Sequence, residues 1–111
     1  MLLDVRTYTC RAGTINAHLA LYEKMGKAPQ VRCLGLPLAY LKTETGDNNE
    51  YVHIWMYENA ADREARRAKM WADEEWLAYV RASAELGALE KQVNKLMTPV
   101  EFFKEPKRVD A

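Results

Sequence analysis

The chain has 111 residues, of which 49% are hydrophobic, and this size and composition fit one compact domain. Sixteen basic and sixteen acidic residues cancel, which argues against binding to nucleic acid or to an anionic membrane surface. The first residues lack the regions of a signal peptide, and no run approaches the ~18 apolar residues of a transmembrane helix, so we expect a soluble, cytoplasmic protein.

Residues 2–10 mix β-branched, aromatic and charged side chains in rough alternation, which predicts a strand. Side chains alternate between the two faces of a strand. One face would carry Leu3, Val5 and Thr7, and the other Asp4, Arg6 and Tyr8.

A helix is predicted over residues 15–26, because apolar residues recur there at helical spacing and Thr14 can cap its beginning. Gly26 and Pro29 are expected to end it. His18 lies on a polar stretch of this helix, so we expect its side chain to be exposed.

The apolar segment 33–45 predicts a second strand, and Pro37 favours a sheet edge because proline cannot donate a ladder hydrogen bond. Turn-forming residues at 45–49 predict a hairpin that leads into a third strand, residues 51–57. These two strands should therefore run antiparallel.

The Ala- and Arg-rich stretch after Asn59 predicts a helix, and Asp73 can begin a further helical segment that extends to about Gln92. Pro99 and the run VEFF at 100–103 predict a closing strand.

This order of elements, β-α-β-β-α-β, predicts an α+β, ferredoxin-like fold in which helices cover one face of a four-stranded antiparallel sheet. Residues 1–104 would form the single domain and 105–111 a flexible C-terminal tail. The first and third strands would be neighbours at the centre of the sheet.

The third strand has two different faces. We expect its aliphatic residues to face the helices and its ring-bearing residues to face the uncovered side, where a second copy of the chain would cover them in a homodimer. The aliphatic set is Val52, Ile54 and Met56, and the ring-bearing set is Tyr51, His53, Trp55 and Tyr57.

Several blocks of the chain resemble the NIPSNAP family, in matching order and over nearly the whole length. They are VRTYTCRAGT (5–14), LALYEKMG (19–26), VHIWMYENAADREARRAKM (52–70) with DEEW (73–76), and TPVEFF (98–103). The resemblance implies a dimeric α+β barrel. Related barrels include cofactor-free monooxygenases, haem-dependent enzymes and ligand-binding proteins, so the resemblance implies no single reaction.

His53 is the strongest candidate for acid/base chemistry, because imidazole titrates near neutral pH and rings flank it on its own strand face. A structural histidine bonded across the dimer is the alternative. Tyr8 shares the candidate catalytic role, and Arg6 could hold a carboxylate or phenolate. The alternative for Arg6 is a structural salt bridge.

Arg63 and Arg67 are a like-charged pair one helical turn apart, which suggests an anionic ligand or a partner carboxylate, although a solvated helix face is the ordinary interpretation. Tyr51, Trp55 and Tyr57 would complete the ligand-binding set. Neither histidine has a companion at metal-ligand spacing, and Cys10 and Cys33 follow no metal or redox pattern. We therefore predict no metal, no cofactor and reduced thiols.

Two functions fit these residues. In the first, the homodimer binds a small aromatic or anionic organic molecule in a cavity at the sheet face, and it could act on that molecule as a cofactor-independent, monooxygenase- or isomerase-like enzyme. In the second, the chain is a non-enzymatic interaction or scaffold domain whose aromatic face only builds the dimer. A cavity with room beyond single waters beside His53 favours the first.

Overall fold

The computed structural model describes residues 1–104 together with 106 and 107. The predicted domain, 1–104, lies within this part of the chain. Most of the predicted tail, 105 and 108–111, lies outside the described residues, so that prediction stays untested.

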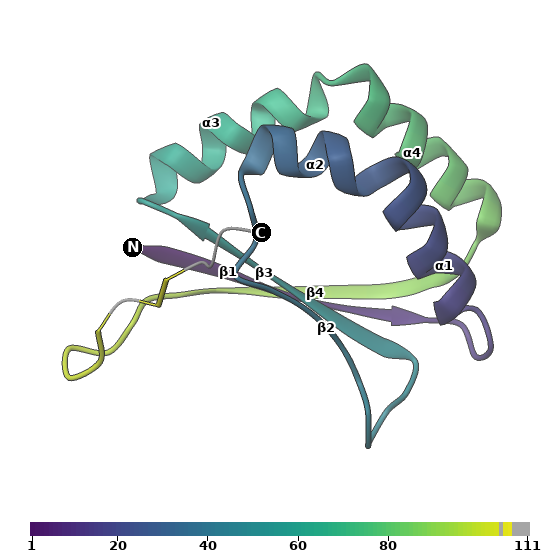
Figure 1. The fold of residues 1–111 in the computed structure, drawn as a ribbon, viewed down its shortest axis with the longest axis horizontal. Coiled ribbons are helices and arrows are strands. Elements are labelled where there is room, and N and C mark those ends of the chain that lie inside the picture. Colours follow the sequence, from purple (N-terminus) through teal and green to yellow (C-terminus); the bar gives the residue numbers. More distant parts are fainter. Residues whose placement is uncertain (105, 108–111) are drawn as a thin grey trace.

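Four strands form one antiparallel sheet: β1 (Leu2–Cys10), β2 (Ala39–Lys42), β3 (Glu50–Tyr57) and β4 (Leu89–Met97). Their order is β2-β3-β1-β4, so β1 and β3 are the central neighbours and β2 lies at an edge. All helices lie on one side of this sheet (Figure 1). The predicted ferredoxin-like α+β fold is confirmed.

The first helical region is longer than predicted. It comprises α1 (Ile15–Leu21), a π-helical turn (Tyr22–Gly26) and α2 (Lys27–Leu34), so Gly26 and Pro29 do not end it. Pro29 lies in the first turn of α2, directly after the π-helical turn.

Gly26 has a packing role instead. A Cβ atom at this position would lie 3.0 Å from ring carbons of Tyr22 and Tyr79. The absence of a side chain therefore lets this helical region approach the helix that carries Tyr79.

The second pair of helices begins as the sequence predicts. In α3 (Ala60–Trp71) the Asn59 side chain accepts a hydrogen bond from the backbone N–H of Asp62, at 2.8 Å. In α4 (Glu74–Leu86) the Asp73 side chain accepts one from the backbone N–H of Trp76, at 3.0 Å.

Two predicted boundaries are wrong. Gly87 ends α4 with φ +67°, and the closing strand is β4 rather than the VEFF run, in which Phe102 is almost fully exposed. Every residue of β4 is exposed, and its many Lys, Glu, Gln and Asn side chains do not give a strand's alternating pattern. The second strand is also shorter than predicted, because Cys33 and Leu34 belong to α2.

The prediction about the two faces of β3 is wrong. The His53 ring lies 5.0 Å from the Tyr22 ring of the helical layer, measured between ring centroids. Trp55 is fully buried and packs in a core that also contains Leu34 and Met70 from the helices. The ring-bearing face of β3 therefore lies beneath the helices, and Val52, Ile54 and Met56 share the opposite face.

This arrangement has two physical causes. Aromatic rings present more apolar area to bury than Val or Ile, so the helical layer covers the rings. The helices also carry polar partners for them: His18, expected to be exposed, is fully buried and lies 2.7 Å from the Tyr51 hydroxyl. The same burial removes the premise of an aromatic face that builds a dimer.

The uncovered face of the sheet is largely aliphatic, since residues paired across strands share a face. We refer to it as the open face. It consists of Leu3, Val5, Thr7, Thr9, Ala39, Leu41, Glu50, Val52, Ile54, Met56, Lys91, Val93, Lys95 and Met97.

Two further expectations can be compared with the structure. Cys10 and Cys33 are both buried and form no disulfide with each other, and their predicted reduced state stays a prediction. In the described ranges, no helix has the length and apolar character needed to cross a membrane.

Replacing Gly26 by alanine is expected to lower the free energy of unfolding by about 1–3 kcal/mol, because the new Cβ meets two rings. At an open helical position the same substitution would raise stability by up to ~1 kcal/mol, so the sign is diagnostic. Chemical denaturation measures the change. In a Tyr79→Leu background the cost should shrink, and an unchanged cost would contradict this packing role.

Candidate functional site

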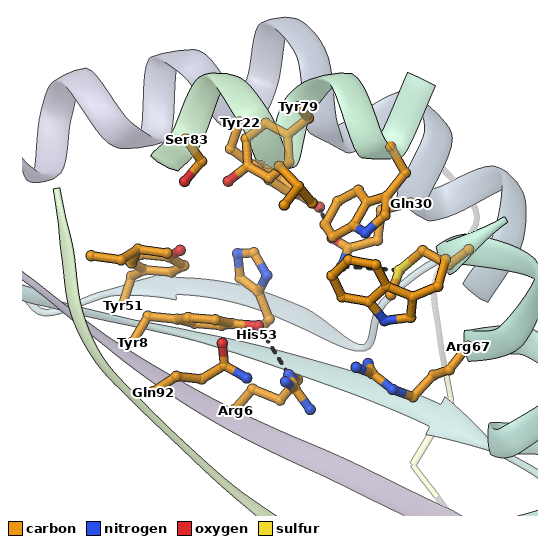
Figure 2. Close-up of a pocket in the computed structure, with 15 residues that line it drawn as sticks. Arg6, Tyr8, Tyr22, Gln30, Tyr51, His53, Arg67, Tyr79, Ser83 and Gln92 are labelled. Carbon is orange, nitrogen blue, oxygen red and sulfur yellow. Dashed lines mark hydrogen bonds between the residues drawn. The ribbon is translucent and has the colours of Figure 1, made fainter. Parts of the chain in front are cut away.

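A cavity of about 200 Å³ lies between the sheet and the helices. It is far larger than the ~10–15 Å³ that a single water requires. Five of the predicted site residues line it (Figure 2): Arg6, Tyr8, Tyr51, His53 and Arg67. The cavity therefore gathers these residues under the helices of one chain, not between two sheets as predicted.

Asp4 fixes one side of this site. Its carboxylate is fully buried and accepts hydrogen bonds from Arg6 Nη1 at 3.2 Å, Arg63 Nε at 3.1 Å and Asn94 Nδ2 at 3.0 Å. Arg63 is thus held by Asp4 and does not line the cavity, which departs from its predicted ligand-binding position.

Arg6 has both a structural and a cavity-facing aspect. It pairs with Asp4, as the salt-bridge alternative predicts, and its Nε donates to the Tyr8 hydroxyl at 2.9 Å. Burial acts to lower the pKa of Arg6, but Tyr8 and Asp4 raise it further than burial lowers it. Arg6 therefore stays charged and orients the Tyr8 phenol.

Arg67 differs from the neighbouring arginines. Among the described residues it forms no hydrogen bond and no ion pair, although its side chain is half-buried and lines the cavity. Burial lowers its pKa, and the charges of Arg6 and Arg63 lower it further. Figure 2 shows its guanidinium directed toward Arg6. Asp4 thus pairs with Arg6 and Arg63 but not with Arg67.

No residue that lines the cavity carries a carboxylate, within the described part of the chain. The two cationic groups at one end of the cavity, Arg6 and Arg67, are therefore not balanced by an acidic side chain of the lining. Such a cavity attracts an anion and repels a cation.

His53 lies at the centre of the cavity wall and is only 4% exposed. Rings of Tyr8, Tyr22, Tyr40 and Tyr51 surround it at centroid distances of 4.6–5.5 Å. Its Nδ1 is buried without a hydrogen-bond partner in the described structure. Burial, followed by the nearby His18 and Arg6, lowers the pKa of His53 to about 3, so the imidazole is neutral.

The sequence reasoning missed the helical half of the site. Tyr22 donates to Gln30 Oε1 at 2.6 Å, and because that uses the only Tyr22 hydroxyl hydrogen, Tyr40 must donate in its 2.8 Å contact with Tyr22. The available signal was the polar hydroxyl of Tyr22 within the apolar stripe of the predicted helix, followed by Gln30 beyond its predicted end. The other missed lining residues are Met70, Trp71, Trp76, Tyr79, Val80, Ser83, Leu89 and Gln92.

Tyr51 lines the cavity and lies on the side remote from Arg67 in Figure 2. Its ring stacks on Tyr8, with centroids 4.8 Å apart and planes 12° apart. Its hydroxyl contacts buried His18. Burial raises the pKa of Tyr51 far above the ordinary phenol value, so the phenol keeps its proton.

Two predicted ligand-binding rings lie outside the cavity lining. Trp55 is part of the core, and Tyr57 is buried beside it with a hydroxyl that has no hydrogen-bond partner in the described structure. No cluster of three or more His, Cys, Asp or Glu residues in the described ranges could hold a metal ion.

Comparison with known proteins gives a consistent family. The NIPSNAP family model matches residues 3–104. No curated protein matches the chain.

Solved structures give a similar result. A NIPSNAP family protein with unknown function from Agrobacterium tumefaciens is 37% identical, with a TM-score of 0.84, and the match covers 93% of this chain and 91% of that one. An uncharacterized NIPSNAP-like domain protein from Burkholderia xenovorans is 31% identical, with a TM-score of 0.87 over 99% of this chain and 94% of that one.

A more distant structure shares the fold alone. It is a putative antibiotic biosynthesis monooxygenase from Nitrosomonas europaea, 13% identical, with a TM-score of 0.63 over 90% of this chain and 99% of that one.

The neutral His53 predicts a pH dependence of stability. Its pKa of about 3 in the folded chain is below its ordinary value of 6.5, so the unfolded chain binds more protons between these values. Stability should be highest above pH 6.5 and fall as pH decreases toward 3, by up to ~1.4 kcal/mol per pH unit from His53.

Urea denaturation of the native chain and of His53→Phe, repeated across this pH range, measures the effect. Phenylalanine keeps a ring among its aromatic neighbours but cannot titrate, so the variant should lose stability less steeply. Parallel slopes would show that His53 does not carry the dependence.

Proposed function

The chain belongs to the NIPSNAP family, and we propose that it binds a small organic carboxylate in the cavity between its sheet and its helices. The observation that carries the proposal is Arg67, a half-buried guanidinium that faces the cavity and has no anionic partner among the described residues. A buried charge without a partner is costly, and a bound carboxylate would supply one.

The local charge balance supports the sign of the ligand. Asp4 neutralises one of the three arginines around it, which leaves an excess of positive charge at this end of the cavity. A carboxylate is planar and can accept two parallel hydrogen bonds from one guanidinium. Burial and the charges of Arg6 and Arg63 lower the pKa of Arg67, and the negative charge of a bound carboxylate would oppose these effects.

The walls support a ligand with a flat apolar body. Tyr8, Tyr22, Tyr51 and Tyr79 line the cavity together with two tryptophans, and aromatic faces stack favourably on planar groups. An aromatic monocarboxylate combines the two features that the cavity offers, a cationic end and aromatic walls.

His53 has a binding role in this proposal. Its low pKa makes it a weak base while the cavity holds only protein groups, so it would act first as a neutral hydrogen-bonding group toward the ligand. A carboxylate close to the ring would raise the pKa of His53 toward its ordinary range. Catalysis by His53 and Tyr8, and a cytoplasmic location, stay predictions from the sequence.

Phenylacetate is a suitable probe for this proposal. Arg67→Met should weaken its binding about tenfold to a hundredfold, because hydrogen bonds to charged groups contribute ~1.5–3 kcal/mol. Isothermal titration calorimetry of the full chain measures the change.

Arg81→Met is the matched control, because Arg81 is exposed on α4 and does not line the cavity. It should bind phenylacetate as the native chain does. Phenylacetamide, which has the same shape without the charge, should bind the native chain weakly. Equal affinity of native and Arg67→Met chains for phenylacetate would reject the proposal.

The open face supports a second element of this proposal, a homodimer. Leu41, Val93 and Met97 are 53%, 45% and 49% exposed in the single chain, and they continue the aliphatic surface of Val52 and Ile54. Contiguous apolar surface of this kind is uncommon on monomers. A second copy related by a twofold axis would cover it with an identical surface.

Val93→Glu should shift the chain from dimer to monomer, since burying an unpaired carboxylate on this surface is unfavourable. Native mass spectrometry and light scattering measure the assembly. Leu86→Glu, on the helical side of the molecule, is the control and should leave the dimer intact. A monomeric native chain would contradict the dimer but not the cavity.

A further inference from the structure

The contact between His18 and Tyr51 joins helix α1 to the wall of the cavity. His18 comes from α1 and is fully buried, and its Nε2 lies 2.7 Å from the Tyr51 hydroxyl oxygen. Either atom can donate at this distance. The direction of the bond decides whether the Tyr51 proton is used inside the protein or is available to the cavity.

The other nitrogen of His18 decides the direction. Nδ1 is buried and has no hydrogen-bond partner among the described residues. If Nδ1 carried the proton, the donor left without a partner would be a buried N–H of His18, which does not line the cavity. If Nε2 carries it, the donor left without a protein partner is the hydroxyl of Tyr51, which lines the cavity, where water or a ligand can accept its hydrogen bond. An unpaired donor sealed away from the cavity is the costlier of the two. The neutral ring has one proton, and it belongs on Nε2.

The consequence concerns Tyr51. Its oxygen accepts from His18 Nε2–H, so its own proton is free to point elsewhere. No other acceptor for this hydroxyl occurs in the described structure. In Figure 2 the hydroxyl lies on the edge of the ring that faces His53 and the cavity.

We propose that His18 is a positioning residue that aims the Tyr51 hydroxyl into the cavity as a hydrogen-bond donor for a second oxygen of the ligand. This inference rests on the proposed carboxylate site and deepens it. Arg67 and Tyr51 lie on opposite sides of the drawn cavity, with His53 between them (Figure 2). The ligand class is therefore an aromatic carboxylate with a carbonyl or similar acceptor oxygen at its far end.

The tautomer can be measured without any ligand. In a two-bond proton–nitrogen NMR spectrum of the ¹⁵N-labelled chain at neutral pH, the His18 ring should show a protonated Nε2 and an unprotonated Nδ1. Signals that disappear in His18→Gln assign the ring. A proton on Nδ1 would overturn the inference, whatever the cavity binds.

Ligand pairs then test the donor. Para-acetylbenzoate and para-isopropylbenzoate differ by a carbonyl oxygen in place of a methyl group, and the corresponding phenylacetates provide a second length. The ratio of the two Kd values in each pair measures how much the carbonyl oxygen contributes to binding. The native chain should prefer the acetyl ligand of at least one pair by about threefold to tenfold, the usual range for a net hydrogen bond.

Tyr51→Phe should reduce that ratio to about one. Its affinity for the isopropyl ligand should stay close to that of the native chain, because Arg6 and Arg67 are unchanged. His18→Leu should also reduce the ratio, since Tyr51 loses the group that directs its proton. A ratio that rises in His18→Leu would mean that His18 had been accepting the Tyr51 proton, and it would reject the inference.

The two proposals fail in different ways. If the native chain binds no carboxylate of either pair, the proposed function fails and the NMR experiment alone decides the tautomer. If carboxylates bind through Arg67 but the acetyl and isopropyl ligands bind equally in the native chain, the proposed function stands and the role of Tyr51 as donor is rejected.

Discussion

The buried carboxylate of Asp4 is the interaction on which the cavity depends. It joins β1 to β4 through Asn94 and to α3 through Arg63, and it also holds Arg6. A fully buried carboxylate requires such partners, because desolvation of an unpaired charge is costly. Through Arg63, Asp4 secures the contact between the sheet and α3. One carboxylate can neutralise only one of the three nearby arginines, and Arg67 is the one without an ion pair among the described residues. The charge of the cavity follows from this imbalance.

The polar groups under the helices form one connected arrangement. Tyr8 is oriented by Arg6, Tyr51 by His18, and Tyr22 by Gln30 and Tyr40, so each phenol near His53 has a fixed partner. Fixed polar groups in an aromatic cavity do not need to reorganise when a ligand arrives, which favours binding. The chain thus has a preorganised cavity between its sheet and its helices, and the open face lies on the other side of the same sheet.

The sequence predicted the order of elements, the ends of β1, the helix caps at Asn59 and Asp73, and the family, because these depend on local patterns and distinctive blocks. It did not predict β4, whose residues are all exposed and lack an alternating pattern, nor the continuation of helix through Gly26, which depends on a contact with Tyr79. It assigned the faces of β3 wrongly, because hydrophobicity ranks Val and Ile above His and Tyr when their partners are unknown. His18 and Asp4, which supply or organise those partners, act through residues distant in sequence. Five of the residues singled out nevertheless meet at the cavity. Strand alternation had already grouped four of them, Arg6, Tyr8, Tyr51 and His53, on one face, and α3 contributes Arg67.

The central claim is that the Arg67 guanidinium binds a carboxylate ligand in the cavity. A crystal structure of the chain with bromine-labelled phenylacetate tests it most directly, because anomalous scattering locates the ring independently of the carboxylate. The account predicts the ring between the sheet and the helices and the carboxylate within hydrogen-bond distance of the Arg67 guanidinium. A structure in which Arg67 instead pairs with an acidic side chain of a second copy, and the cavity contains no phenylacetate, would contradict it.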